Sequence, residues 1–507
     1  MDGPVVRYGE REIPHDMVRV EAARTAAGLA EAGVRHSDRV ALVLRNEPTF
    51  LSLSAACGLL GAVPVAVNWH WHGKELGHVI AHSDSRVVFA HSDFIANVEE
   101  VLPAGVPLVE VPVPDELTAH YGPAPVTGRR PLLAEWIGAH EPDAQPLDAA
   151  PMSLIYTSGT TGLPKGVIRD VMAPEQSRDV AAATLAAMGL RPGMHTLVTA
   201  PMYHSAPNAQ ALFALALGME LTVMPRFAPE AFLALVESEA VTHVQTVPTM
   251  FVRLLELPEE VRAQYDLGSL ECVVHAAAPC PAHIKRRIID WFGPVIREYY
   301  GATEIGIVVV CDSEEWLAHE GAVGRAFGGS DIHVFDADGR RLGPGETGEI
   351  FIRPPAYWPG FTYLGQDDKR REIERDGYIS IGDVGHVDED GYLYLSDRAR
   401  DMVISAGVNI YPAEIEACLL ELHGVRDVAV FGIPDDSYGE ALAAHVDPDP
   451  SAGLTETAVR DHVRARLAGY KVPRVVVFDT ELPREESGKI YKRRIRERYW
   501  QAAGRNI

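Results

Sequence analysis

Residues 156–167 read YTSGTTGLPKGV and combine the groups that can hold a polyphosphate. Glycines let backbone N–H groups turn toward an anion because no Cβ stands in the way. The hydroxyl groups add donors, and successive amides in such a turn form an anion-binding concavity. Lys165 brings a mobile positive charge to the same loop. The segment therefore predicts a polyphosphate site, the alternative being an ordinary surface turn rich in Gly, Ser and Thr.

A strand should position this loop, since residues 152–156 form a short apolar run typical of a buried strand. The Walker-type phosphate loop needs Gly-Lys-Ser/Thr at the start of a helix, whereas Lys165 is followed by Gly166 and Val167. A GxGxxG fingerprint is also absent from this segment. The loop is therefore of neither common nucleotide-binding type.

The surrounding pattern predicts how the chain presents the loop. Strand and helix patterns alternate to about residue 300, which indicates parallel sheets covered by helices. Short strands with Gly-rich turns then predict a β-rich subdomain, and the pattern after residue 400 is α+β. The expected helices are 18–32 (ended by Gly33), 49–60, 413–422 and 455–467, and the expected strands are 40–44, 63–67, 331–338, 348–353, 391–396, 425–431 and 475–478.

The predicted fold class is α/β with two domains, because 507 residues are too many for one core. We expect a large N-terminal domain at residues 1–397, with parallel sheets flanked by helices plus the β-rich subdomain. A hinge is expected at residues 398–401, and a small mobile α+β C-terminal domain at residues 402–507.

Composition excludes several classes of protein. The net charge of −25 opposes nucleic acid and anionic membrane as partners, so the basic stretch KIYKRRIRERYW is better interpreted as a solvated helix face. No apolar stretch approaches the roughly 20 residues of a transmembrane helix, and the N-terminus lacks the apolar core of a signal peptide. Five scattered cysteines without CxxC spacing favour the cytoplasm and argue against structural zinc. A homodimer is left open.

A group of histidines near residue 75 suggests a metal site at first sight. Such a site needs a third ligand in a suitable position, and the sequence offers none. We therefore expect a helix that packs its apolar side inward and carries histidines at its edge. The histidines are His70, His72, His78 and His82, and the inward side chains are Leu76, Val79 and Ile80.

The 156–167 loop resembles the signature loop of the adenylate-forming superfamily, which includes acyl-CoA synthetases, luciferases and peptide-synthetase adenylation domains. Other segments resemble that family's motifs in the family's order along essentially the whole chain. They are PMYHS at 201–205, AAAP at 276–279, YGATE at 300–304, GD at 382–383 and PREESGK at 483–489. The chain looks most similar to the ligases that join fatty or aryl acids to CoA.

The resemblance implies a site for ATP and Mg²⁺. Tyr300 would stack on adenine, Thr303 would contact phosphate, and Asp383 and Arg398 would hold the ribose. A carboxylate such as Glu304 suits Mg²⁺, which needs only one or two protein oxygens beside water and phosphate. The implied nucleotide site comprises Thr157, Ser158, Gly159, Thr160, Thr161, Gly162, Lys165, Ala277, Ala278, Pro279, Tyr299, Tyr300, Gly301, Asp383 and Arg398, with Thr161 and Glu304 as metal ligands.

The same resemblance implies catalytic and CoA-binding groups. Lys489 would be the catalytic lysine, helped by Thr303, with His204 beside the acyl pocket. Ser405, Ala406 and Gly407 would line the tunnel for CoA after the C-terminal domain turns, and Lys471 would help bind CoA. Ala276 and Ala406 occupy positions where relatives often have glycine. The methyl group of Ala276 should narrow the acyl pocket slightly, and that of Ala406 leaves open an acceptor other than the CoA thiol.

The implied reaction joins a carboxylic acid to CoA through an acyl-adenylate, with release of pyrophosphate. Pocket residues are expected at 204–208, 245–250, 275–278 and 301–306, which are mostly small or apolar and contain no Lys or Arg. A second carboxylate would be buried there without a partner. The substrate is therefore expected to be a hydrophobic fatty, aryl or steroid side-chain monoacid rather than a dicarboxylate.

Three alternatives remain from the sequence. The adenylate could go to a carrier-protein thiol, although no carrier domain is present in these residues. Relatives that adenylate nitrite to diazotise an aryl amine are similar in sequence, and Ala406 and His275 keep that reading open. A non-catalytic nucleotide-binding protein is disfavoured, since a decayed enzyme should have lost one of Lys165, Glu304, Asp383, Arg398 and Lys489.

Overall fold

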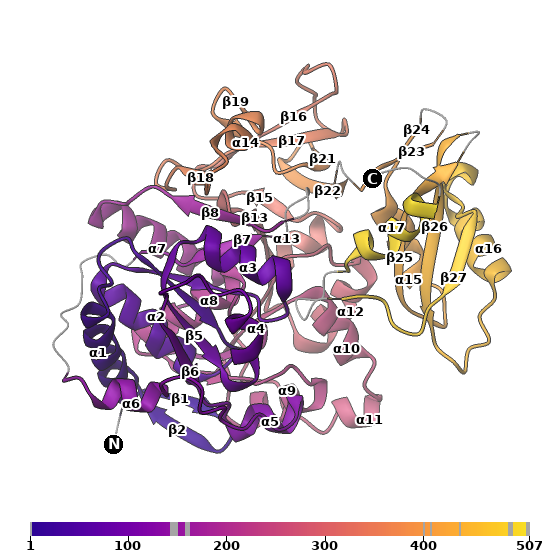
Figure 1. Cartoon of the computed structure of the whole chain (residues 1–507). Helices are drawn as coiled ribbons and strands as arrows, with labels where there is room; N and C mark the ends of the chain where they lie inside the picture. Colours follow the sequence, from indigo (N-terminus) through magenta and orange to yellow (C-terminus); the bar gives the residue numbers. More distant parts are fainter. Residues whose placement is uncertain are drawn as a thin grey trace.

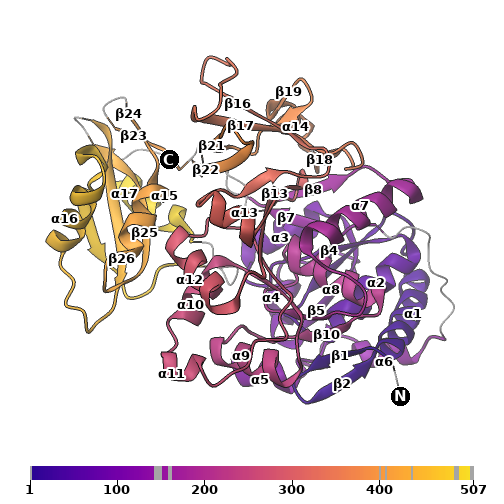
Figure 2. The ribbon, with the colours of Figure 1, turned by 180° about the vertical axis from the view of Figure 1, so that it is seen from behind.

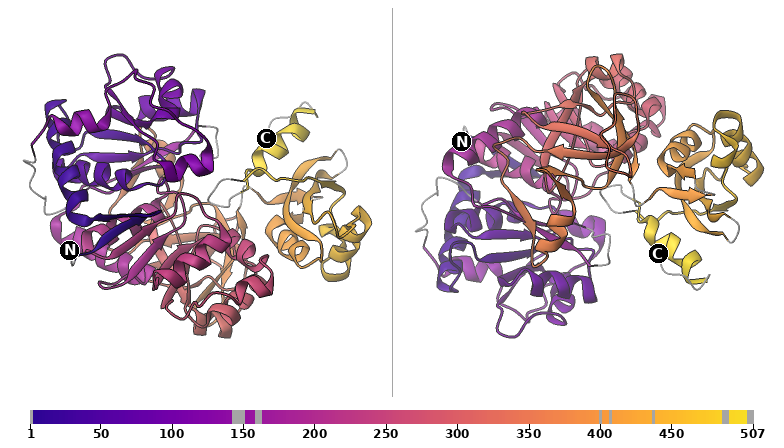
Figure 3. Two further views of the ribbon diagram at one scale, coloured as in Figure 1. Left: turned by 90° about the horizontal axis from the view of Figure 1, so that it is seen from below. Right: turned by 90° about the horizontal axis from the view of Figure 1, so that it is seen from above.

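The computed structural model describes residues 3–141, 151–157, 163–398, 401–405, 408–435, 438–484 and 490–502. The chain forms a large part of sheets and helices and a smaller part with a sheet of its own, as the α/β prediction expects (Figure 1). Views from behind and from below show the smaller part beside one end of the larger one (Figures 2 and 3).

The largest sheet combines parallel strands with a run of antiparallel strands toward one end and the antiparallel edge strand β2 at the other. The β-rich region predicted after residue 331 is confirmed, and β15 links its strands to β14 and thus to the parallel strands. In spatial order the strands are β19 (Glu374–Arg375), β20 (Tyr378–Ile379), β17 (Gly348–Arg353), β21 (Asp383–Val387), β22 (Tyr392–Arg398), β15 (Gly324–Ala326), β14 (Gly306–Asp312), β13 (Ile296–Ala302), β12 (Cys272–His275), β11 (His243–Thr246), β9 (His195–Val198), β10 (Glu220–Val223), β1 (Val5–Tyr8) and β2 (Arg11–Pro14), with β16 (Asp331–Phe335) beside β17.

A second sheet carries the strand that precedes the phosphate loop. Its strands β3 to β7 are parallel, while β8 and β18 add an antiparallel edge. In spatial order they are β18 (Phe361–Tyr363), β8 (Lys165–Arg169), β7 (Leu154–Thr157), β4 (Val63–Ala66), β3 (Arg39–Val43), β5 (Ser85–His91) and β6 (Leu108–Val111).

The strand β18 connects the two sheets in an unusual way. Its neighbours along the chain, β17 and β19, belong to the largest sheet, but Phe361 pairs with Arg169 and Tyr363 pairs with Val167 of β8. This crossing brings the residues just before and within β18 to the turn between β13 and β14.

A third, smaller sheet forms the core of the C-terminal part. The chain leaves the largest sheet at the end of β22 and enters this sheet at β23. The α+β pattern predicted after residue 400 is confirmed by these elements, while the hinge stays a prediction because residues 399 and 400 lie outside the described residues. The strands are β24 (Val408–Ile410), β23 (Val403–Ser405), β26 (Gly439–Pro448) and β25 (Val425–Asp435), with β27 (Val475–Phe478) beside β26.

Helices cover the sheets and separate the two large ones. The main core contains Leu42 of β3, Phe50 of α2, Ala211 of α8 and Leu221 of β10, so α2 and α8 lie between the sheets. The helices are α1 (His15–Glu31), α2 (Pro48–Leu60), α3 (Gly73–His82), α4 (Ile95–Glu99), α5 (Asp115–Tyr121), α6 (Leu133–Gly138), α7 (Pro174–Met188), α8 (Ser205–Leu217), α9 (Pro229–Ser238), α10 (Pro248–Leu255), α11 (Glu259–Arg262), α12 (Ala282–Phe292), α13 (Ser313–Ala318), α14 (Asp367–Glu372), α15 (Pro412–Leu420), α16 (Glu456–Arg466) and α17 (Lys492–Ala502), with 3-10 turns at Ser92–Phe94 and Gly469–Lys471.

Two bulk features bear on the sequence predictions. Among the described residues, no helix is both long and apolar enough to span a bilayer. The five cysteines are all free thiols.

A buried histidine makes the fold sensitive to acid. The His243 ring on β11 is fully buried, with Nε2 2.9 Å from the Met188 carbonyl and Nδ1 2.7 Å from the Thr196 hydroxyl. The carbonyl can only accept, so Nε2–H donates and Nδ1 accepts, as a neutral ring requires. Burial accordingly lowers the pKa of His243 from 6.5 to about 4.

We expect the free energy of unfolding to fall as the pH drops below that of free histidine. The unfolded chain takes up a proton between pH 6.5 and about 4 that folded His243 cannot bind. Between about pH 7.5 and about pH 5, His243→Gln should therefore lose about 2 kcal/mol less stability than the wild type in urea unfolding. The exposed His36 serves as control, since His36→Gln should lose as much as the wild type. Equal losses in all three proteins would contradict the assignment.

Candidate active site

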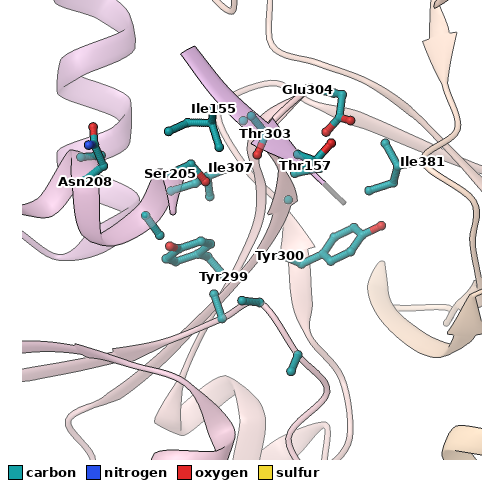
Figure 4. Close-up of a pocket in the computed structure, with 18 of the residues that line it drawn as sticks. Ile155, Thr157, Ser205, Asn208, Tyr299, Tyr300, Thr303, Glu304, Ile307 and Ile381 are labelled. Carbon is teal, nitrogen blue, oxygen red and sulfur yellow. The ribbon is translucent and has the colours of Figure 1, made fainter. Parts of the chain in front are cut away.

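A cavity of about 2680 Å³ opens where the ends of β7 and β13 face the C-terminal part. In Figure 4, Thr157, Thr303 and Glu304 lie close together, while Ile155, Ser205 and Ile307 lie to one side and Tyr300 points to the other. The cavity thus has a polar region at the strand ends and an apolar region toward α7 and α8. The apolar wall includes Ile155, Val180, Met188, Leu212, Phe213 and Ile307.

The phosphate-loop prediction falls partly outside the described residues, because Ser158, Gly159, Thr160, Thr161 and Gly162 are not among them. The two ends of the loop are defined. Thr157 closes β7 and pairs with Lys165, which opens β8, so the loop joins two neighbouring antiparallel strands. The ammonium group of Lys165 lies 5.1 Å from the centre of the Tyr363 ring.

The histidines of α3 support this loop. His78 Nε2 is 3.0 Å from the carbonyl oxygen of Pro164, and His82 Nδ1 is 3.0 Å from the Tyr156 hydroxyl. The two rings stack with their centroids 4.7 Å apart. The predicted inward side of the helix is confirmed, since Leu76, Val79 and Ile80 are buried. These histidines therefore fix the strands on both sides of the loop.

The hairpin of β13 and β14 carries the YGATE motif. A register shift between Tyr300 and Gly301 turns the strand, and a Cβ at Gly301 would collide with the carbonyl of Gly306. The Tyr300 hydroxyl donates to Asp383 Oδ2 at 2.7 Å. Asp383 also pairs through its backbone with Arg398, whose side chain is outside the described residues. The predicted adenine and ribose residues are therefore neighbours.

Glu304 is held tightly. Its side chain is buried, and Oε1 accepts a hydrogen bond from the Tyr363 hydroxyl at 3.0 Å. Burial and the nearby carboxylate raise the pKa of Tyr363, so this hydroxyl remains a donor. The Glu304 carbonyl accepts from Trp358 Nε1 at 3.1 Å. Glu304 also lines the cavity, and a carboxylate oxygen at a cavity wall fits Mg²⁺.

Arg169 completes the support of this turn. Its guanidinium donates to the carbonyl of Thr303 at 2.5 Å and lies 5.6 Å from the centre of the Trp358 ring. Arg169 also lines the cavity, although it lies outside the segments predicted to form the acyl pocket. Burial lowers the pKa of Arg169 to about 10, which leaves it charged at neutral pH.

Residues 276–279 follow β12 and also line the cavity. Ala277 has φ = 74°, in the left-handed region that costs a residue with a Cβ about 1–2 kcal/mol. Such strain is often retained where a loop meets a ligand. Ala278 and Pro279 continue the same wall, as predicted from the AAAP motif.

His275 does not reach the cavity, contrary to its predicted place in the pocket. Its ring is fully buried, lies 5.4 Å from the Phe251 ring, and has Nε2 3.6 Å from Glu298 Oε2. Glu298 Oε2 also accepts a hydrogen bond from Lys285 Nζ at 2.5 Å. Burial, helped by Lys285, lowers the pKa of His275 well below its ordinary value. This buried group lies beneath the 276–279 loop.

The other predicted pocket segments are present in part. The cavity wall includes Ser205 and Asn208, whereas His204, one residue earlier, packs against the ring of Tyr203 at 4.3 Å. Gln245 lies behind the wall and donates to the Tyr299 hydroxyl at 2.7 Å. Of the predicted segment 245–250, Pro248 and Thr249 line the cavity.

The C-terminal part contributes to the cavity wall residues that lie close in sequence to the predicted catalytic lysine. Arg484, Ile490 and Tyr491 line the cavity, while residues 485–489, including Lys489, are outside the described residues. Within the described part of 403–410, no residue contributes to the wall, and Ala406 and Gly407 are not described. Lys471 forms an ion pair with Glu414 at 2.5 Å.

Comparison with known proteins agrees with the motifs. A family model described as AMP-binding enzyme matches residues 1–362, and one described as AMP-binding enzyme C-terminal domain matches residues 414–489. Feruloyl-CoA synthase from Amycolatopsis sp is 35% identical over 497 residues, which cover 97% of this chain and 95% of that protein. Long-chain-fatty-acid–CoA ligase FadD13 from Mycobacterium tuberculosis is 31% identical over 490 residues, with 94% and 91% covered.

A solved structure shows the same overall fold. Amide bond synthetase McbA from Marinactinospora thermotolerans superposes with a TM-score of 0.82 at 26% identity, covering 98% of both chains. The chain belongs to the AMP-binding enzyme family, which confirms the resemblance to adenylate-forming enzymes. It is an AMP-forming acid–thiol ligase that uses ATP, Mg²⁺ and CoA.

The Tyr363 contact predicts a specific effect on metal use. Tyr363→Phe keeps the ring beside Lys165 but removes the donor that orients Glu304. Losing a hydrogen bond to a charged group should raise the Mg²⁺ concentration for half-maximal pyrophosphate release about tenfold or more. Weaker Mn²⁺ binding in the presence of an ATP analogue, measured by electron paramagnetic resonance, should accompany it.

The control is Tyr357→Phe, which changes a tyrosine in the segment before β18 whose backbone carbonyl, rather than its hydroxyl, binds Gln176. This variant should show the same Mg²⁺ dependence of pyrophosphate release and the same Mn²⁺ binding as the wild type. Identical Mg²⁺ curves for Tyr363→Phe and the wild type would remove Tyr363 from the positioning role.

Proposed function

We propose that this enzyme activates a hydrophobic monocarboxylic acid of the fatty, aryl or steroid side-chain type and transfers it to CoA. The apolar region of the cavity supports this proposal most directly, because Val180, Leu212, Phe213 and Ile307 would surround the organic part of the acid. Burying such a chain or ring is favourable by roughly 25 cal/mol per Å² of apolar surface. The polar region beside it provides for ATP.

Each nucleotide group then has a place in the site. We assign the phosphates to the 157–165 loop, adenine to the space between Tyr300 and residues 277–279, and the ribose to Asp383 and Arg398. The Tyr300–Asp383 hydrogen bond would hold the adenine and ribose parts in a fixed relation. Glu304, with Thr161, would bind Mg²⁺, which neutralises phosphate charge when it is bound.

The chemistry begins when a carboxylate oxygen of the acid attacks the α-phosphorus of ATP. A P–O bond forms, the bond to pyrophosphate breaks, and the product is a mixed anhydride of the acid and AMP. Negative charge grows on the oxygens around phosphorus, where Thr303 and Lys489 are placed by this proposal. Preorganised donors and cations at such a point are usually the largest catalytic contribution of the protein.

The second step needs a different face of the C-terminal part. The CoA thiolate attacks the acyl carbonyl, and AMP leaves with its phosphate. We propose that the C-terminal part rotates about residues 398–401, so that Ser405 to Gly407 replace the Lys489 side at the cavity. The present orientation, with Arg484 and Tyr491 at the wall, suits the first step. The free thiols are consistent with action in the cytoplasm.

A panel of acids tests the substrate and the acceptor together. We expect pyrophosphate release with medium and long fatty acids, cinnamic acids or steroid side-chain acids, and CoA thioester formation with the same acids. Malonate should be at least about a hundredfold poorer, since an extra buried charge costs several kcal/mol. Pyrophosphate release with nitrite and an aryl amine, but with none of the acids, would contradict the proposal. Release without CoA consumption would point to another acceptor, such as a carrier-protein thiol.

Separate half-reactions test the roles of the two faces. Lys489→Ala should lower pyrophosphate release from acid and ATP by roughly a hundred- to a thousandfold, since it removes a charge worth about 3–4 kcal/mol in the transition state. Given synthetic acyl-adenylate and CoA, that variant should form thioester at nearly the wild-type rate. Gly407→Phe is the matched variant and should show the opposite pattern. Equal losses by both variants in both assays would exclude the rotation.

A further inference from the structure

The acyl side of the cavity contains one buried cation that the nucleotide site does not require. Arg169 ends β8, and Met172, Ser177 and Val180, which follow it, line the same cavity. Beside Arg169, the wall is formed by the Trp358 ring, whose face lies against Gly306. A Cβ at Gly306 would lie 2.7 Å from this ring, so the packing between them is close.

The guanidinium of Arg169 has more N–H donors than its surroundings have acceptors for them. Arginine carries five N–H donors and no acceptor. The Thr303 carbonyl takes one of them, from Nη2, while Nε and Nη1 have no hydrogen-bond acceptor among the described residues. Nε is enclosed by the protein, so Nη1 is the donor that a ligand in the cavity can reach. Leaving a buried donor unsatisfied is unfavourable, so a ligand that brings an acceptor to this point gains affinity.

The charge around Arg169 decides which acceptor fits. Glu304 is close enough to act electrostatically on Arg169 and already opposes its positive charge. A carboxylate from the substrate would have to share the single positive charge of Arg169 with Glu304, which would leave one negative charge in excess. A neutral oxygen satisfies the donor without this penalty. An ether, carbonyl or phenolic oxygen on an otherwise apolar acid has the required properties.

We propose that Arg169 is a specificity-determining residue that binds a neutral oxygen substituent of the acid. This inference rests on the proposed function, since it concerns the acid that occupies the apolar part of the cavity. It narrows the substrate from hydrophobic acids in general to hydrophobic acids with an oxygen acceptor at one position. Trp358 and Ile307 would contact the apolar groups on either side of that oxygen.

Matched acids isolate this contact. Methoxycinnamic and ethylcinnamic acids have nearly the same shape, but only the methoxy group accepts a hydrogen bond, and the substituent can be placed ortho, meta or para. We expect the wild type to prefer methoxy over ethyl by about tenfold in kcat/KM at one of these positions, the scale of one hydrogen bond to a charged donor. The ratio cancels any effect shared by both acids, including effects on ATP use.

The variants separate recognition from support of the Thr303 turn. Arg169→Met should bring the methoxy/ethyl ratio to about one, and Arg169→Lys, which keeps the charge but loses the planar guanidinium group with Nη1, should lower it partly. Arg178→Met removes an exposed arginine from α7 and should leave the ratio unchanged. A wild-type ratio near one at all three positions would overturn the proposal without any variant. An Arg169→Met protein that loses activity equally on both acids, with a raised KM for ATP, would also overturn it.

The two levels of proposal fail in different ways. If the wild type releases no pyrophosphate with any acid, the proposed function itself is wrong. If it releases pyrophosphate with both methoxy and ethyl acids at the same kcat/KM, the function stands and only the role of Arg169 is lost.

Discussion

The carboxylate of Glu304 lies at the seam between the two large sheets, and the organisation of the site depends on how it is anchored there. Glu304 belongs to the hairpin of β13 and β14 in one sheet, while its partner Tyr363 belongs to β18 in the other. The neighbouring carbonyls are bound by Arg169 and Trp358, again from or next to the second sheet. A buried carboxylate is stable only when its charge is compensated and hydrogen-bonded.

This anchoring places distinct chemical environments side by side. Donors and cations gather at the ends of β7, β8 and β13, and small or apolar side chains of α7 and α8 cover the remaining space. Behind the 276–279 loop, the buried pair of Lys285 and Glu298 holds β13 against α12. Removing one partner of such a pair is costly, because it leaves an uncompensated charge in the interior.

The sequence identifies the parts of the site whose chemistry is local. The 156–167 loop and the YGATE turn could be found because glycines, hydroxyls and a carboxylate lie within a few residues of each other. Arg169 was missed although it shares a strand face with Lys165, since its buried position depends on β18, almost 200 residues later. His275 was misplaced because it adjoins a wall residue, whereas its own side chain points into the core.

The same contrast applies to the fold. Helix and strand segments follow from periodicity and agree with the structure, including α15, α16 and β27 of the C-terminal part. The β-rich pattern predicted after residue 331 agrees with β16, β17, β21 and β22, but local patterns do not encode that β15 joins β14 to β22. Long-range strand pairing is decided by packing of the whole molecule and cannot be predicted from one segment.

The crossing of β18 has a mechanical consequence. The chain leaves the largest sheet after β17, pairs with β8 of the second sheet as β18, and returns to the largest sheet at β19. This path ties the two large sheets together beside the active site. Sliding one sheet along the other would break the backbone hydrogen bonds of β18 and separate Tyr363 from Glu304. The crossing thereby suppresses shear between the two large sheets.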